Sequence, residues 1–241
     1  MSRIAENLKL IYGGGAEEYL ETAKQAMVSG EKKFIITANA EILMMAEKDN
    51  VIQEMLLKES VSMVPDAISI VHAMKKFDIP VQERVTGVEL TEALFQHAGE
   101  NSLSIYLLGA SEEVVKTLAQ KLKNDYPQIT LNYHNGYDGD KDKIFEEIKN
   151  QKPDLIVVAL GVPAQELLIN RHYDDFAKGI FIGVGGSFDV LSGLKKRAPK
   201  IFLKTNMEWL YRITREPARL KRFYNSNIKF MNYLAKERKK R

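Results

Sequence analysis

Short runs of apolar and β-branched residues recur along the first three quarters of the chain, and each has the length of a β-strand. They begin near Phe34, Val61, Leu103, Ile129, Leu155 and Ile180. Between the runs, apolar residues repeat at helical spacing instead. In 112–126, Val115, Leu118, Ala119 and Leu122 share one helix face, and Ile144 and Ile148 do so in 141–150. The pattern predicts strands that alternate with helices.

This alternation predicts an α/β fold of the Rossmann-like kind. Because the strand runs are apolar almost throughout, both faces of the sheet must be covered, which is typical of a mostly parallel sheet with right-handed helical crossovers. Ligands of such sheets bind at the carboxyl ends of the strands. The residues directly after each run are therefore the first candidates for a functional site.

The chain from Ala198 onward lacks strand-like runs and is expected to be helical. One amphipathic helix is predicted up to Glu216-Pro217, because a residue before proline disfavours helical geometry. A second helix is predicted after it. The apolar positions of the two helices are Phe202, Leu203, Met207, Trp209, Leu210 and Ile213, then Leu220, Phe223, Tyr224, Met231 and Leu234.

The net charge also differs sharply between the strand-containing part of the chain and its helical end. From Lys195 to Arg241 there are 16 Lys and Arg against three Glu, which gives +13, whereas the other 19 basic and 29 acidic residues give −10. We therefore divide the chain into an α/β domain, 1–194, and a basic amphipathic helical appendage, 195–241. Such a segment favours polyanions, and its apolar faces favour an anionic membrane surface. A solubilising tail, and a helical hairpin packed on its own domain or on a second copy, are the alternatives.

The amino-acid composition adds information on the size of the core, on location and on membrane spans. The 241 residues, 45% of them hydrophobic, suffice for one main core, and the absence of cysteine excludes disulfides and favours an intracellular location. No run approaches about 18 apolar residues, so the sequence predicts no membrane span. Exposed apolar residues in the appendage also favour self-association into a homo-oligomer where no membrane is present.

Small polar residues follow the first two strand runs. Thr37 and Asn39 either bind a sugar or nucleotide hydroxyl or cap the next helix. Asp66 is either a general base at the opening of the sheet or an N-cap. The sequence alone leaves both pairs of interpretations open.

Glycine turns follow three other runs, at Gly109, at Gly161 and at Gly183–Ser187. The last is the best candidate for a phosphate loop, because Gly185 and Gly186 precede a helix and their amides could cradle a diphosphate. The same glycines also permit tight packing of strand against helix. Neither the dinucleotide fingerprint nor the P-loop pattern is present.

No metal site is predicted. The alternating acidic residues of 138–142 lack the other ligands of a calcium loop and are interpreted as a solvated turn with an N-cap. The histidines show no metal-ligand spacing and receive no role: His72, His97, His134 and His172.

Seven motifs, taken together and in order, resemble the WecG/TagA/CpsF glycosyltransferase family, and most closely its TagA-type members. The resemblance extends from about Phe34 to Arg222. The motifs are Thr37-Ala38-Asn39-Ala40-Glu41, Pro65-Asp66, Arg84 before Thr86-Gly87, Gly161-Val162-Pro163-Ala164-Gln165-Glu166, Gly185-Gly186-Ser187-Phe188-Asp189, Arg197-Ala198-Pro199 and Glu208-Trp209-Leu210-Tyr211-Arg212.

The resemblance implies a reaction. Such enzymes transfer N-acetylmannosamine from UDP, with inversion and without a required metal or cofactor, to N-acetylglucosaminyl-diphospho-undecaprenol in wall teichoic acid linkage-unit synthesis. It therefore implies a UDP-sugar donor, a polyprenyl-diphosphate-linked acceptor and a place at the cytoplasmic face of the membrane. A relative that uses another UDP-hexosamine or its uronic acid is the alternative within the family.

The resemblance also implies roles for residues. Asp66 would deprotonate the acceptor hydroxyl, with Thr37 and Asn39 beside it in the sugar pocket. Guanidinium groups would stabilise the departing UDP in place of a metal, and docking of the appendage at the membrane would complete the active site. The implied substrate-binding residues are Asn39, Arg84, Gln165, Gly185, Gly186, Asp189, Arg212, Arg219 and Arg222.

The sequence departs from the family pattern at three places. Ala67-Ile68-Ser69 stands where a glycine-containing turn is expected, Ala164 where a lysine is usual, and Asn206 where a glycine is expected. Two other classes compete with the transferase. One is a nucleotide-dependent oxidoreductase, which lacks its fingerprint here, and the other is a nucleic-acid-binding module that uses the basic appendage and its aromatic residues.

Overall fold

The computed structural model describes residues 2–216 and 219–238 and contains a six-stranded sheet in which every adjacent pair is parallel. The strand order is β2-β1-β6-β5-β3-β4. The strands are β1 (Lys32–Ala38), β2 (Val61–Pro65), β3 (Ser104–Gly109), β4 (Thr130–His134), β5 (Leu155–Ala159) and β6 (Gly179–Gly183). The predicted strand runs and the parallel α/β class are confirmed.

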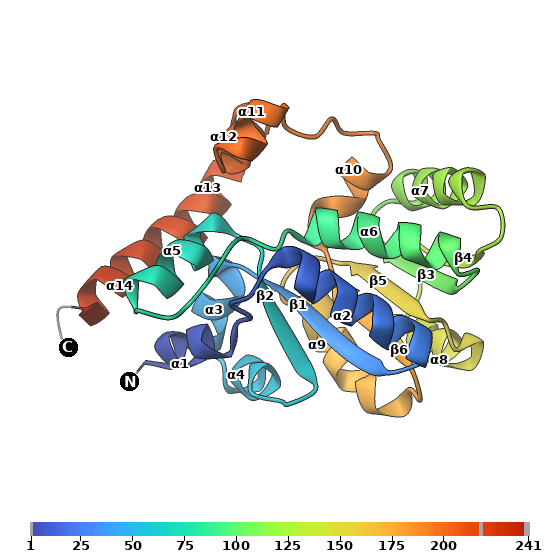
Figure 1. Cartoon of the computed structure of the whole chain (residues 1–241), viewed down its shortest axis with the longest axis horizontal. Helices are drawn as coiled ribbons and strands as arrows, with labels where there is room; N and C mark the ends of the chain where they lie inside the picture. Colours follow the sequence, from blue (N-terminus) through green and yellow to red (C-terminus); the bar gives the residue numbers. More distant parts are fainter. Residues whose placement is uncertain (1, 217–218, 239–241) are drawn as a thin grey trace.

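Helices cover both faces of this sheet (Figure 1). On one face, α1 (Arg3–Leu10), α3 (Ala40–Ala46), α4 (Asn50–Leu56), α5 (Ile68–Lys76), α8 (Lys141–Gln151) and α9 (Ala164–His172) share a single apolar core. On the other, α2 (Ala16–Ser29), α6 (Gly87–Glu100), α7 (Glu112–Asp125) and α10 (Phe188–Leu191) share a second. Every residue of β5 and β6 is buried, which explains their unbroken apolar runs.

The predicted helices begin at side-chain caps. Ser111 accepts a hydrogen bond from Val114 N at the start of α7, and Asp140 accepts from Asp142 N and Lys143 N at the start of α8. The apolar residues Val115, Leu118 and Leu122 of α7 are buried. The interpretation of 138–142 as a turn that ends in an N-cap is therefore confirmed.

The chain after Ala198 is helical, as predicted, but its first helix is not continuous. It is divided into α11 (Lys200–Lys204) and α12 (Glu208–Arg215), so the single helix predicted through this region was wrong. Asn206 interrupts it with φ of 57°, a left-handed backbone that is incompatible with a right-handed helix. α12 ends at Arg215 with Glu216 as its C-cap residue, as expected, whereas Pro217 lies outside the described residues.

The second predicted helix comprises α13 (Arg219–Phe223), a π-helical segment, η3 (Tyr224–Ile228), and α14 (Lys229–Arg238), which follow one another without interruption. α14 packs on the α/β body. Phe230 and Leu234 are fully buried in the core that α3 and α5 share, and Tyr233 donates a 2.6 Å hydrogen bond to Glu47. One alternative was a helical hairpin packed on its own domain. For α14, the packing on its own domain is confirmed.

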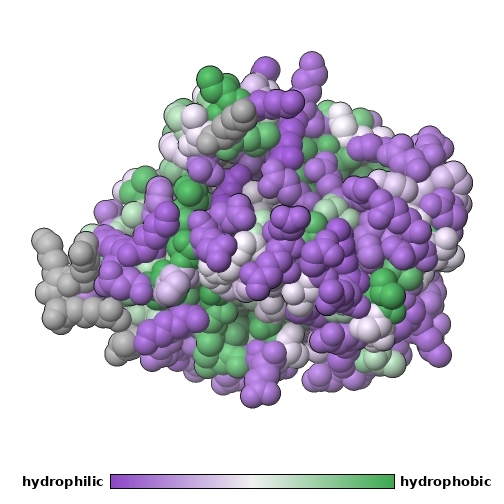
Figure 2. All heavy atoms as spheres, viewed as in Figure 1, coloured by the Kyte–Doolittle hydropathy of each residue, from purple (hydrophilic) through white to green (hydrophobic). Residues whose placement is uncertain are grey.

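The beginning of the appendage is different, because α11 and α12 project from the body (Figure 1). No residue of α12 is buried, and Ile201 and Trp209 are 68% and 40% exposed. Figure 2 shows hydrophobic and hydrophilic residues next to each other over this projection. Across the described ranges, no helix has both the length and the apolar character that a membrane span requires.

Candidate active site

A cavity of about 550 Å³ opens at the carboxyl ends of β1, β2, β5 and β6. This is the edge at which parallel sheets bind ligands, and the volume suits a small organic substrate. Residues of α12 and of the π-helical segment line the cavity on the side of the appendage. Both predicted parts of the chain therefore contribute to one site.

Asp66 lies in this cavity immediately after β2. Its Oδ1 accepts a 2.7 Å hydrogen bond from the backbone amide of Gly87, the first residue of α6. The following helix, α5, begins at Ile68, and its N-cap residue is Ala67, so the interpretation of Asp66 as the N-cap of that helix was wrong. The carboxylate is held by another helix and faces the cavity.

Opposing influences act on the acidity of Asp66. Burial raises the pKa of this carboxyl above its ordinary value, while the Gly87 hydrogen bond and the charges of Arg84 and Arg212 lower it. The carboxylate of Glu208 raises it further. The net effect is a raised pKa, which makes the carboxylate a better proton acceptor than an exposed aspartate.

Two of the arginines named from the sequence converge on this aspartate. Arg84, just before α6, and Arg212, on α12, both line the cavity. Between them lies Glu208, whose carboxylate is 2.7 Å from a guanidinium nitrogen of Arg212 and 3.9 Å from one of Arg84. The Arg84–Glu208 pair joins the α/β body to the appendage, the Glu208–Arg212 pair lies within α12, and both guanidinium groups stand beside the cavity.

Thr37 and Asn39 occupy the end of β1, and their side chains make different contacts. Thr37 is buried and donates a 2.9 Å hydrogen bond to the carbonyl of Gly183 on β6, so it does not cap a helix. Asn39 caps α3, where its oxygen accepts hydrogen bonds from Glu41 N and Ile42 N. Both residues also line the cavity, so capping and ligand contact are compatible for Asn39.

Gln165 acts as a brace beneath the glycine turns. Its buried Oε1 accepts hydrogen bonds from Gly161 N at 3.1 Å and from Gly185 N at 2.9 Å, and its Nε2 donates to Glu166. The amide of Gly185, which has φ of 50°, is thus already used. Gly185 and Gly186 were both predicted to donate their amides to a diphosphate. Because the Gly185 amide is bonded to Gln165, this prediction remains only for Gly186.

Asp189 lies apart from Asp66, in an adjoining cavity of about 390 Å³. Basic side chains of Lys195, Lys196, Arg197 and Arg215 line that cavity too, and Gly186 and Arg212 line both cavities. Asp189 pairs with Lys195 at 3.5 Å. The side chains of Arg219 and Arg222 lie outside the described part of the chain, so their predicted roles stay predictions.

Several cavity residues were not among the site residues named from the sequence. The indole of Trp209 stacks on Phe223 with ring centroids 4.6 Å apart, and Ser69 on α5 donates a 2.9 Å hydrogen bond to Asn227 of the π-helical segment. Glu208 and Trp209 belong to one of the seven family motifs, and this motif was the sequence signal that could have placed them at the site. Ser69 and Asn227 meet only through folding, and no pattern in the chain points to their contact.

The arrangement defines a class of enzyme. A carboxylate with a raised pKa can remove a proton from a hydroxyl, and adjacent guanidinium groups can stabilise an anionic leaving group. A cavity that combines them at the edge of a parallel sheet is suited to group transfer between an anionic donor and an alcohol.

Comparison with known proteins assigns the family. The model of the glycosyl transferase WecG/TagA/CpsF family matches residues 10–241, and the chain belongs to that family of glycosyltransferases. An N-acetylglucosaminyldiphosphoundecaprenol N-acetyl-beta-D-mannosaminyltransferase of Staphylococcus aureus (strain MW2) is 34% identical over 241 residues, which is 100% of this chain and 89% of the relative. A protein of the same name from Bacillus spizizenii is 36% identical over 190 residues, covering 78% of this chain and 74% of the relative.

Proposed function

We propose that this protein transfers N-acetylmannosamine from UDP to N-acetylglucosaminyl-diphospho-undecaprenol, with inversion, in wall teichoic acid linkage-unit synthesis. The observation that carries the proposal is Asp66, a carboxylate of raised pKa in the cavity beside Arg84 and Arg212. The names of these two relatives support the acceptor and the transferred sugar.

In the proposed reaction, the carboxylate of Asp66 takes the proton of an acceptor hydroxyl as that oxygen attacks the anomeric carbon of the donor. The bond from that carbon to the phosphate oxygen breaks on the opposite face, and UDP leaves with the bonding electrons. Arg84 and Arg212 are within reach of the cavity and stabilise the charge that develops on the diphosphate. The role of Thr37 is to hold the end of β1 against β6 beside the base.

We further propose that the appendage, 195–241, places the site at the inner face of the bacterial membrane. Exposed apolar side chains on α11 to α13, including Ile201, Trp209 and Leu220, stand among the basic residues that give this segment its +13 charge. Apolar insertion and attraction to acidic headgroups act together on such a surface. Because Glu208, Trp209 and Arg212 line the cavity, docking would also fix one wall of the active site.

The decisive measurement is release of UDP from UDP-N-acetylmannosamine with a short-chain polyprenyl-diphospho-N-acetylglucosamine acceptor. Release that depends on the acceptor and is lost in Asp66→Asn supports the proposal. Asp138→Asn, which removes an aspartate outside the cavity, is the matched control and should retain activity. No release with this donor, but release with another UDP-hexosamine or its uronic acid, would reassign the sugar and leave the proposed base in place.

Membrane docking has a separate test, in which the protein is sedimented with vesicles of phosphatidylglycerol or of phosphatidylcholine. Binding to the anionic vesicles alone, reduced in Ile201→Ser and Leu220→Ser, is expected. Val51→Ser removes a side chain of similar exposure, 59%, on α4 and serves as the control. Equal binding by all the variants would contradict the assignment of this surface.

A further inference from the structure

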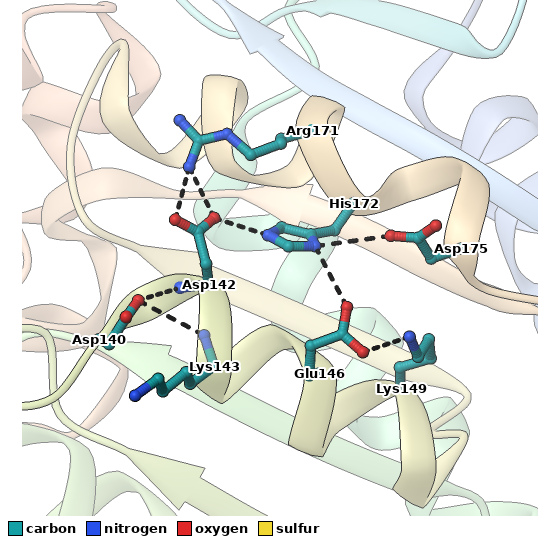
Figure 3. A network of polar contacts seen from close by, with 8 residues as sticks. All are labelled: Asp140, Asp142, Lys143, Glu146, Lys149, Arg171, His172 and Asp175. Atoms are coloured by element: carbon teal, nitrogen blue, oxygen red, sulfur yellow. Dashed lines mark hydrogen bonds and ion pairs between the residues drawn. The ribbon is translucent and has the colours of Figure 1, made fainter.

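A second group of ionisable side chains lies on α8, at the end of α9 and on the short helix η1 (Tyr173–Asp175), as Figure 3 shows. Ligand-type atoms of Glu146, His172 and Asp175 all lie within 4.8 Å of one another. None of these residues lines the cavity that holds Asp66. Gln165, which lines that cavity, is seven positions before His172 on α9, or about 10 Å along a helix axis.

The imidazole of His172 is held in one orientation by residues outside this trio. Its Nε2 is 2.7 Å from Asp142, which also accepts hydrogen bonds of 2.6 and 2.7 Å from Arg171. The ring is nearly buried and stacks on Phe145, with centroids 5.2 Å apart. In the tautomer that carries its proton on Nε2, this proton is donated to Asp142 and Nδ1 keeps its lone pair, which is the usual arrangement of a metal-binding histidine.

Nδ1 faces two further carboxylates. Asp175 Oδ2 is 3.6 Å away and Glu146 Oε1 is 3.9 Å away, beyond hydrogen-bond length. A lone pair directed at two anions is repulsive unless a positive charge lies between them. Tetrahedral zinc, with ligands at about 2.0 to 2.2 Å, separates its ligand atoms by roughly 3.3 to 3.5 Å. The two distances from Nδ1 exceed this separation by about 0.1 to 0.6 Å, and the two carboxylate oxygens lie within 4.8 Å of each other, so small side-chain movements would bring the three atoms to suitable positions.

We propose that His172 Nδ1, Glu146 and Asp175 bind one divalent cation of the zinc class, with water completing its coordination. One nitrogen and two carboxylate oxygens suit this class better than calcium or magnesium, which prefer oxygen ligands alone. Lys149 pairs with the other oxygen of Glu146 and so directs Oε1 toward the ring. The ion links α8 to the segment that enters β6 and acts there as a structural clamp.

The test uses the full chain without an affinity tag, stripped of metal and titrated with zinc chloride in a calorimeter. One ion per chain is expected, and cobalt substituted for zinc should give the visible absorption of a tetrahedral site. At about 100 times the dissociation constant, zinc should raise the melting temperature by roughly 5 to 10 °C. Neither measurement uses a sugar substrate, so the result is independent of the proposed transferase activity.

Variants identify the ligands. His172→Ala and Asp175→Asn should abolish the cobalt spectrum, and Asp142→Asn, which changes the partner of Nε2 but no proposed ligand, should weaken binding by about 10 to 100 fold. Asp174→Asn removes the neighbouring exposed carboxylate of η1 and should bind as the unaltered chain does. Asp175→Asn alters an exposed residue, so it remains informative if His172→Ala fails to fold.

Two results would overturn the proposal. One is the absence of zinc binding by the unaltered chain. The other is zinc binding that Asp175→Asn and His172→Ala leave unchanged, which would place the ion elsewhere.

Discussion

The carboxylate of Asp66 accepts its 2.7 Å hydrogen bond from the amide of Gly87, so the end of β2 and the beginning of α6 are joined at the candidate base. The bond fixes the direction of the carboxylate and partly offsets the effect of burial on its pKa. A methyl group at position 87 would lie 2.9 Å from Thr37 Cγ2, so the absence of a side chain there lets the helix approach the base and its neighbour closely. Rigid support of this kind is what a general base requires.

Substitution Asp66→Asn should abolish most of the transfer without unfolding the chain. The amide oxygen can still accept from Gly87 N, whereas the side chain no longer takes a proton, so kcat should fall by about 10² to 10⁴ fold. Since burial disfavours the charged carboxyl, the melting temperature at neutral pH should be unchanged or higher. Undiminished turnover by a folded Asp66→Asn protein would exclude this residue as the base.

The pH dependence of kcat/KM should report the same group. Asp66 acts when deprotonated, so activity should rise with pH through its pKa, and that rise should lie above the ordinary aspartate value of about 4. Glu208 raises this pKa, so Glu208→Gln should move the rise to lower pH. Glu92→Gln changes an exposed carboxylate that pairs with Arg197 and should not move it. A rise that stays in place in Glu208→Gln would contradict the coupling.

The sheet could be predicted from the sequence because its signal is local. Each strand of a covered parallel sheet is apolar along its whole length, so β5 and β6 are visible as runs, and the carboxyl end of each strand identifies Thr37 and Asp66 as neighbours. Asp140 as an N-cap follows from the same local chemistry. These features depend on a few adjacent residues.

The parts that were missed depend on contacts between distant residues. Hydrophobic periodicity continues through Thr205–Met207 and gives no sign that Asn206 adopts a left-handed backbone. The use of the Gly185 amide by Gln165, 20 positions earlier, is likewise invisible in a loop motif. The contacts of His172 with Asp142 and Glu146 are not visible in the sequence either, because these two carboxylates come from another helix.

Gln165→Ala should destabilise the protein more than its size suggests. The change leaves the amides of Gly161 and Gly185 without their acceptor and opens space beside Gly183, so the loss should be about 2 to 4 kcal/mol. Denaturant unfolding measures it directly. Gln96→Ala removes an exposed glutamine that donates a hydrogen bond to Glu100 of the same helix and should cost below about 0.5 kcal/mol. Equal losses of unfolding free energy in the two variants would show that the hydrogen bonds of Gln165 to the two glycine amides do not stabilise the protein.

Asn206 stands where the family pattern leads one to expect glycine, and its φ of 57° explains why either residue fits. Asparagine tolerates the left-handed region better than most residues with a side chain, whereas alanine pays about 1 kcal/mol or more there. Asn206→Gly should therefore be nearly neutral, and Asn206→Ala should lower the free energy of unfolding by that amount. The matched control is Thr205→Ala. Thr205 is the preceding residue, and its φ of −89° is not left-handed, so alanine is not strained there. Because the turn at Asn206 sets the direction of α12, and α12 carries Glu208 and Arg212 to the cavity, Asn206→Ala should also weaken UDP binding, measured by calorimetry. If Asn206→Ala and Asn206→Gly were equally stable, the conformation assigned to this turn would be wrong.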